Sequence, residues 1–206
     1  MSGAFPISSA KFSTLGIKST QNTLVSITDS GKKLSRQIDG QRFGFTAKII
    51  TAKRDEVYGQ LMAFIMKQRS GKENFTIVPP ELQDAKGHEN GTVLVDGVHS
   101  AGDTTIDMDG FAHDGTKRFK AGDFIKFANH TKVYMVIEDV TASSNSATVT
   151  IEPPLVSSLA DNEAVTYDNV PFTVYLTNDV QEFGTVGANV SGDLLYQFEL
   201  DVEEAL

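Results

Sequence analysis

The clearest hydrophobic pattern in the chain is an alternation of apolar and polar positions that begins at Arg42. The apolar positions are Phe43, Phe45, Ala47 and Ile49. Successive side chains of a strand point to opposite faces, so this pattern predicts a strand with one buried face. Upstream, the apolar runs Phe12–Ile17 and Thr23–Ile27 predict a first hairpin, and Asp29–Gly31 predicts a turn.

The periodicity changes from two to 3.6 after Ile50, which predicts a helix over about residues 52–70. Thr51 is the expected N-cap, and Gly71 the expected end. Acidic side chains in the first turn and basic ones in the last turn suit the helix dipole. The predicted buried face holds Val57, Leu61, Phe64, Ile65 and Gln68. A strand over Phe75–Val78 is expected to follow, before Pro79 and Pro80.

The middle of the chain reads as an all-β unit bounded by polar segments. Glu81–Asn90 has no apolar period and predicts an exposed linker. Short β-branched and aromatic runs follow at the spacing of a small barrel or sandwich. These predicted strands are Thr92–Val95, Thr104–Met108, Phe124–Phe127, Val133–Glu138, Ala147–Ile151 and Ala164–Tyr167. The third to fifth of them form a meander.

The C-terminal segment returns to alternation over Phe172–Leu176 and again over Leu194–Val202, with a loop predicted between them over Gly184–Gly192. A two-stranded hairpin is marginal alone, and the N-terminal unit lacks strand partners. The sequence therefore predicts a mainly β protein with a discontinuous body. Residues 1–86 and 172–206 would form an α+β, sandwich- or barrel-like body with one helix, and residues 87–171 an inserted all-β module.

Composition narrows the class of protein. The 206 residues include no cysteine and no tryptophan, so a disulfide framework or thiolate metal site is impossible. With 27 acidic and 18 basic side chains, the net charge of −9 argues against a phosphate-binding nucleic-acid protein or an anionic membrane partner. Met1–Pro6 does not resemble a secretory leader, and no apolar run reaches roughly 18 residues. We expect a soluble protein, assembled in the cytoplasm and without a membrane partner.

No motif with specific chemistry emerges. The four histidines, His88, His99, His113 and His130, lack metal-pair spacing and are expected in solvated loops. The acidic cluster Asp103, Asp107, Asp109 and Asp114 around Gly110 fails the EF-hand spacing, because Thr105 stands where the first aspartate should be. A turn between strands is the preferred interpretation.

The remaining motif tests are also negative. Ser30–Lys33 matches a phosphate loop only at Gly31-Lys32, and no nucleophile elbow, dinucleotide fingerprint or zinc-protease helix occurs. We therefore predict no catalytic, cofactor-binding or metal-binding residues, no cofactor, and no enzymatic activity.

A set of short motifs, taken together and in order, resembles the distal tail proteins of long-tailed (siphovirus-type) bacteriophages. The motifs are Arg42–Thr46, Ala63–Ile65, Gly71, Asn74–Thr76, Lys120–Asp123, Lys132–Tyr134, Phe198–Leu200 and Glu204–Leu206. The resemblance covers nearly the whole chain, including its order of body, insert and return to the body.

The resemblance implies a structural protein of the virion tail tip. Six copies would close into a ring that joins the tail tube to the baseplate hub and tail fibres, with a lumen for DNA in transit. The inserted module would be similar to an oligonucleotide/oligosaccharide-binding (OB) barrel, although no helix signal separates its third and fourth strands. Exposed body-strand edges, or a long loop over Ser30–Gly40, would be docking surfaces. The net charge suggests that acidic side chains face the lumen.

Two other classes of function stay open at this stage. The insert could be a carbohydrate-binding module that grips the host surface, since OB-type folds bind oligosaccharides. Such a site needs exposed aromatic platforms, and the insert offers Phe111, Phe119, Phe124, Phe127, Tyr134 and Tyr167. An enzyme would need a polar pocket with perturbed carboxylates, assembled from residues distant in sequence.

Overall fold

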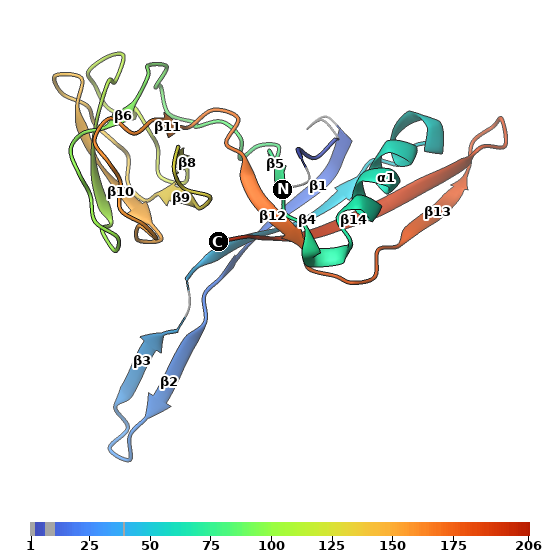
Figure 1. Ribbon diagram of the computed structural model, residues 1–206, viewed down its shortest axis with the longest axis horizontal. Helices are drawn as coiled ribbons and strands as arrows, with labels where there is room; N and C mark the ends of the chain where they lie inside the picture. Colours follow the sequence, from blue (N-terminus) through green and yellow to red (C-terminus); the bar gives the residue numbers. More distant parts are fainter. Residues whose placement is uncertain (1–2, 7–10, 39) are drawn as a thin grey trace.

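The computed structural model describes residues 3–6, 11–38 and 40–206. It shows two six-stranded sheets and a separate two-stranded hairpin that projects from one of them (Figure 1). The prediction of a mainly β chain is confirmed. Within the described residues, no helix is long and apolar enough to cross a membrane.

Among the described residues, the helical elements with given bounds lie between the fourth and fifth strands. The strands are β1 (Phe12–Thr20), β2 (Thr23–Ile27), β3 (Lys33–Gln37), β4 (Arg42–Ile49), β5 (Phe75–Ile77), β6 (Leu94–Val95), β7 (Thr105–Asp109), β8 (Phe124–Phe127), β9 (Val133–Val136), β10 (Ala147–Glu152), β11 (Val165–Thr166), β12 (Phe172–Leu176), β13 (Phe183–Ala188) and β14 (Leu194–Glu204). The helical elements are a π-helical turn η2 (Arg54–Tyr58), the helix α1 (Gly59–Lys67) and a 3₁₀ turn η3 (Ser70–Lys72).

The body sheet draws its strands from both ends of the chain, in the order β1-β4-β14-β12-β5, with β13 beside β14. The apolar positions of β4 face a core that also contains Leu61 and Ile65 of α1. Phe45 and Ala47 of β4 are fully buried, as the alternation predicted. At one edge, Phe5 donates its backbone N–H to Thr76 of β5 at 2.7 Å, and β1 lies at the other edge.

The helical region is shorter than predicted at both ends. Helical geometry begins at Arg54 rather than near Thr51, with Lys53 as the N-cap and Asp55 in the first turn. The helix ends at Lys67, and Arg69 has a left-handed φ of 54°. Gly71 is needed for another reason than ending the helix: a Cβ there would lie 2.6 Å from the carbonyl oxygen of Leu176 in β12.

The predicted first hairpin is wrong. β1 continues through the polar residues to Thr20 and pairs with β4, while β2 pairs with β3. The ladder of β1 with β4, the stem, runs from the pair Phe12–Ile49 to the pair Thr20–Arg42, and the separate ladder of β2 with β3 lies beyond it. The stem belongs to the body sheet, and the outer part, residues 22–38, projects from it as the arm (Figure 1). The turn over Asp29–Gly31 lies at the tip of this arm, as predicted.

The predicted loop over Gly184–Gly192 is also partly wrong, because β13 occupies Phe183–Ala188 and pairs with the first half of β14. The ring of Phe183 stacks on that of Phe198 with centroids 4.5 Å apart, which ties β13 to the body core. β14 and β13 run past this core, so Leu194 is 53% exposed although its alternation predicted burial.

The inserted region forms the second sheet, in the order β11-β8-β9-β10-β7-β6. All six predicted strands of this region are present, and the meander is β8-β9-β10. The two ends of the sheet meet through a bridge between Leu94 and Ala164, which gives a nearly closed barrel around a second apolar core.

The segment Glu81–Asn90 is not the exposed linker that its polar sequence predicted. Ala85 donates its N–H to the carbonyl of Tyr167, and Val170 donates to that of Gln83, both at 2.9 Å. The outgoing and returning chains therefore run side by side. The N–H of Lys86 also donates to the buried carboxylate of Asp123 at 2.7 Å, so backbone hydrogen bonds order this polar segment.

We expect Gly71→Ala to lower the free energy of unfolding by about 1–3 kcal/mol, because the added methyl group meets a backbone carbonyl in a packed region. Gly184→Ala is the matched control, since a Cβ there has no neighbour within 4 Å. Urea denaturation of both variants measures the difference. Equal midpoints would contradict the packing described at Gly71.

Candidate functional site

The residues singled out as candidate metal ligands do not converge. Within the described ranges, no group of three or more His, Asp or Glu side chains is placed to hold a metal ion. His88 and His113 are exposed, as expected. His130 is not a solvated loop residue: it is buried, and its Nδ1 lies 2.7 Å from the hydroxyl of Tyr134.

The acidic cluster around Gly110 holds turns and strands together. Asp114 accepts a hydrogen bond from the N–H of Asn145 at 2.8 Å, and this bond with that from Ser144 lowers the pKa of Asp114. Asp107 accepts from the hydroxyl of Thr148 at 2.6 Å. Gly110 has a φ of 76°, and a Cβ there would lie 2.2 Å from the Thr92 carbonyl oxygen. These contacts account for the carboxylates as parts of the loop architecture.

The aromatic side chains of the insert lie inside the barrel or at its junction with the body. All six are buried, with exposed fractions between 0% and 7%. They are Phe111, Phe119, Phe124, Phe127, Tyr134 and Tyr167. Residues 87–171 therefore present no aromatic platform on which a sugar ring could stack.

A buried ion pair joins the insert to the body. Lys132, just before β9, places its Nζ 2.5 Å from Oε2 of Glu204 at the end of β14, and both side chains are 0% exposed. Glu204 also accepts the N–H of Val133 at 2.7 Å and that of Phe43 at 3.2 Å. One carboxylate thus binds β4 of the body and β9 of the insert together.

Aromatic rings surround this pair. The ammonium of Lys132 lies 4.4 Å from the centroid of the Phe43 ring, and the rings of Phe43 and Phe124 pack edge to face at 5.3 Å. Phe124 and Val133 of the insert belong to the same apolar cluster as the body core. Burial lowers the pKa of Lys132, and the attraction of Glu204 opposes this shift.

The arm exposes apolar side chains on both of its faces. Residues directly paired across β2 and β3 share a face, so Leu24, Leu34 and Ile38 lie with Arg36 on one face, while Val25 and Ile27 lie with Lys33 on the other. The five apolar side chains are between 48% and 70% exposed. Ser30–Gly40, expected as a loop, consists largely of β3, and residue 39 lies outside the described residues.

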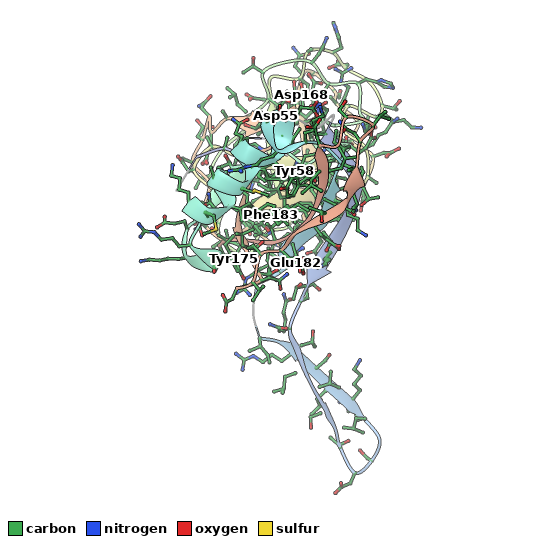
Figure 2. All side chains as sticks on the ribbon, turned by 90° about the vertical axis from the view of Figure 1, so that its right-hand side faces the viewer. Asp55, Tyr58, Asp168, Tyr175, Glu182 and Phe183 are labelled. Carbon is green, nitrogen blue, oxygen red and sulfur yellow. The ribbon has the colours of Figure 1, made fainter. Side chains whose placement is uncertain are left out.

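The arm cannot bury these side chains by itself. A two-stranded hairpin has no interior, and Figure 2 shows the arm extending from the body with no other element beside it. At 3.3 Å per residue, the strands carry its tip about 25 Å from the stem. Covering a Leu, Ile or Val side chain contributes about 1.5–3 kcal/mol, so the arm has a strong tendency to be covered by another surface.

A second exposed surface lies along the segment 178–193, which contains β13. It carries Asp179, Glu182 and Asp193 and no lysine or arginine. Val180, Val186 and Val190 are 83%, 54% and 108% exposed. Glu182 lies next to Phe183 at this side of the body (Figure 2), and a surface groove runs from Val180 and Glu182 to Glu199 of β14.

The sequence contained a signal for each feature that was missed. Glu204 continues the core-facing alternation of Leu200 and Val202. A buried carboxylate is costly unless it is paired, so this position predicts a buried cationic partner. The arm was present as the period-two series Leu34, Arg36 and Ile38, which the long-loop interpretation overlooked.

Comparison with known protein families relates the inserted region to a described family. Residues 82–170 match the family model described as "Distal tail protein pb9, B domain". The matched range contains all six strands of the second sheet. A search of curated proteins found no match.

We expect Lys132→Met to lower the free energy of unfolding by about 3–5 kcal/mol, because it leaves the Glu204 carboxylate buried and uncompensated. Lys48→Met is the control: the exposed pair of Lys48 with Glu199, at 3.8 Å, should contribute no more than about 1 kcal/mol. Denaturant unfolding measures both. A Lys132→Met chain as stable as the control would contradict a structural role for the junction pair.

The stability of the folded chain should fall as the pH drops below 6.5, because burial lowers the pKa of His130 from that value and the nearby Glu163 only opposes the shift. Between the two pKa values the unfolded chain binds a proton that the folded chain does not, so acid favours unfolding. Melting temperatures at pH 7.5 and 5.5 should differ less for His130→Gln than for the wild type. The exposed-site variant His113→Gln should keep the wild-type difference in melting temperature. If His130→Gln also kept that difference, protonation of His130 would not be its cause.

Proposed function

We propose that this chain, a distal tail protein of the siphovirus type, closes into a ring of six copies that joins the tail tube to the baseplate hub and tail fibres. As a phage tail protein it is a virion component that contacts other tail components. Placement at the tail tip, and assembly in the host cytoplasm, belong to the proposal. The role is mechanical and includes no catalytic step, cofactor or metal.

The observation that carries the proposal is the arm. Closed cyclic symmetry needs two different surfaces on each copy, one of which fits the other on the next copy around the ring. A hairpin that exposes five apolar side chains on two faces is suited to such a contact, because it is incompletely buried in a single chain.

The charge distribution supports a central channel through which DNA can pass. The arm contains three of the 18 basic side chains and one of the 27 acidic ones. Engaging the arm in subunit contacts would leave the remaining surface more acidic than the chain as a whole. An acidic channel wall repels phosphates and gives DNA no binding site.

We infer a division into a ring-forming body, residues 1–86 and 172–206, and an inserted domain, residues 87–171. The two apolar clusters support this division, although Phe124 and Val133 of the insert join the body cluster. The insert would then stand at the outside of the ring, held in a fixed orientation by the Lys132–Glu204 pair. Its barrel would act as a docking or stabilising module, with OB-like architecture as part of the proposal.

A carbohydrate-binding role for the insert is the second candidate from the sequence. The burial of all six aromatic side chains in residues 87–171 disfavours it, because stacking on sugars requires exposed rings. Glycan-array binding by the full chain would reverse this preference.

Mass measurement of the purified chain at increasing concentration, followed by negative-stain electron microscopy, tests the ring. We expect a species of six copies with an open centre. Removing the arm's apolar surface with Leu24→Ser, Ile27→Ser and Leu34→Ser should abolish it, while Val98→Ser on the insert should not. A chain that remains monomeric up to about 100 µM, where contacts of about −5.5 kcal/mol would be half-saturated, would contradict the proposal.

A further inference from the structure

The arm and the segment 178–193 are complementary in charge. Residues 22–38 of the arm carry Lys32, Lys33 and Arg36 against Asp29 alone. The segment carries three carboxylates and no cation. Among the described residues, Asp179, Glu182, Lys33 and Arg36 take part in no salt bridge within the chain, so their charges are available to a partner.

The two surfaces are also complementary in their apolar content. The arm presents Leu24, Leu34 and Ile38 beside Arg36, and the groove along the segment presents Val180 and Val186 beside Glu182. A mixed surface of this kind gains from burying apolar area and from placing opposite charges together, and the charges fix the register.

The arm and β13 leave the body in different directions (Figure 1). A contact between them is therefore made by two copies of the chain. Since the surfaces differ, the contact is heterologous, and repeating it generates a ring or a filament rather than a two-fold dimer.

We propose that the arm of one copy docks, by the face that carries Leu34 and Arg36, in the groove formed by segment 178–193 and β14 of the next copy, with Arg36 facing Glu182. This inference rests on the proposed ring and names the surfaces that close it. The groove lining includes Val180, Glu182, Val186, Glu199 and Asp201, and its one lysine, Lys48, is paired with Glu199 at 3.8 Å.

The absence of cysteine from the chain allows a direct test by cross-linking. Leu34→Cys places a thiol on the arm, and Val186→Cys places one in the groove; both parent side chains are about half exposed. The two full-length variants are mixed and treated with a short bismaleimide. Val98→Cys, at a 76% exposed position of the insert, replaces each partner in the control reactions.

We expect a cross-linked dimer from the mixture of Leu34→Cys with Val186→Cys. We expect no dimer from either variant alone or from its mixture with Val98→Cys. A double variant carrying both cysteines should give a ladder that ends at the ring. Arg36→Glu should reduce the yield by at least about tenfold, because like charges then face each other. Adding Glu182→Lys on the groove partner should restore it.

The outcomes separate this inference from the proposed ring. Rings seen by mass and microscopy without the 34–186 cross-link would overturn the arm-to-groove contact and leave the ring standing, with another tail protein as the occupant of the groove. Cross-linking of Leu34→Cys to itself would indicate a two-fold contact and overturn the inference. No assembly and no cross-link at the same concentration would contradict both.

Discussion

The buried pair of Lys132 and Glu204 is the interaction on which the arrangement of the whole chain depends. Both charges are fully withdrawn from water, at 2.5 Å from one another, where the insert meets the body. Moving two ions out of water costs several kcal/mol each, and the cost is offset only when their geometry and hydrogen bonds are satisfied. Glu204 meets this condition by binding Lys132 and the backbone N–H groups of Phe43 and Val133. The insert can therefore satisfy the pair in one orientation only.

The buried junction and the two cores contrast with the arm, whose apolar side chains remain exposed. Each of the two sheets packs apolar side chains into a core, and the junction pairs its buried charges. The arm leaves its apolar side chains exposed, because a two-stranded ribbon cannot cover its faces. A folded frame with one exposed, basic projection suits a subunit of an assembly, and we propose the acidic segment around β13 as the matching surface.

The sequence predicted the buried parts of this fold well and the projecting parts poorly. The alternation of Phe43, Phe45 and Ala47 located β4, and the meander of the insert was recognised from its β-branched runs, because burial selects residues by type. The partner of β1 was predicted wrongly, since the polar residues 18–20 continue a strand whose partner, β4, begins more than twenty residues later. The order of apolar and polar residues within a strand does not identify a partner strand so distant in sequence. Likewise, Gly184–Gly192 looked like a loop because β13 is fixed by the stacking of Phe183 on Phe198 rather than by propensity.

The proposed assembly surfaces could be predicted only in part, for a related reason. An exposed apolar side chain such as Ile27 has the same sequence signature as a buried one, so the arm was indistinguishable from a core strand until its surroundings were known. The junction was readable in principle, because Glu204 occupies a core-facing position of β14, but its partner Lys132 lies 72 residues away.

A cryo-electron microscopy map of tail tips that contain this protein would show directly whether the proposed ring exists. We expect a closed ring of six copies, with each arm lying against the next copy, each insert on the outside of the ring, and the Lys132–Glu204 junction intact in every copy. A map in which the arms are uncovered, or in which the inserts line the channel, would contradict it.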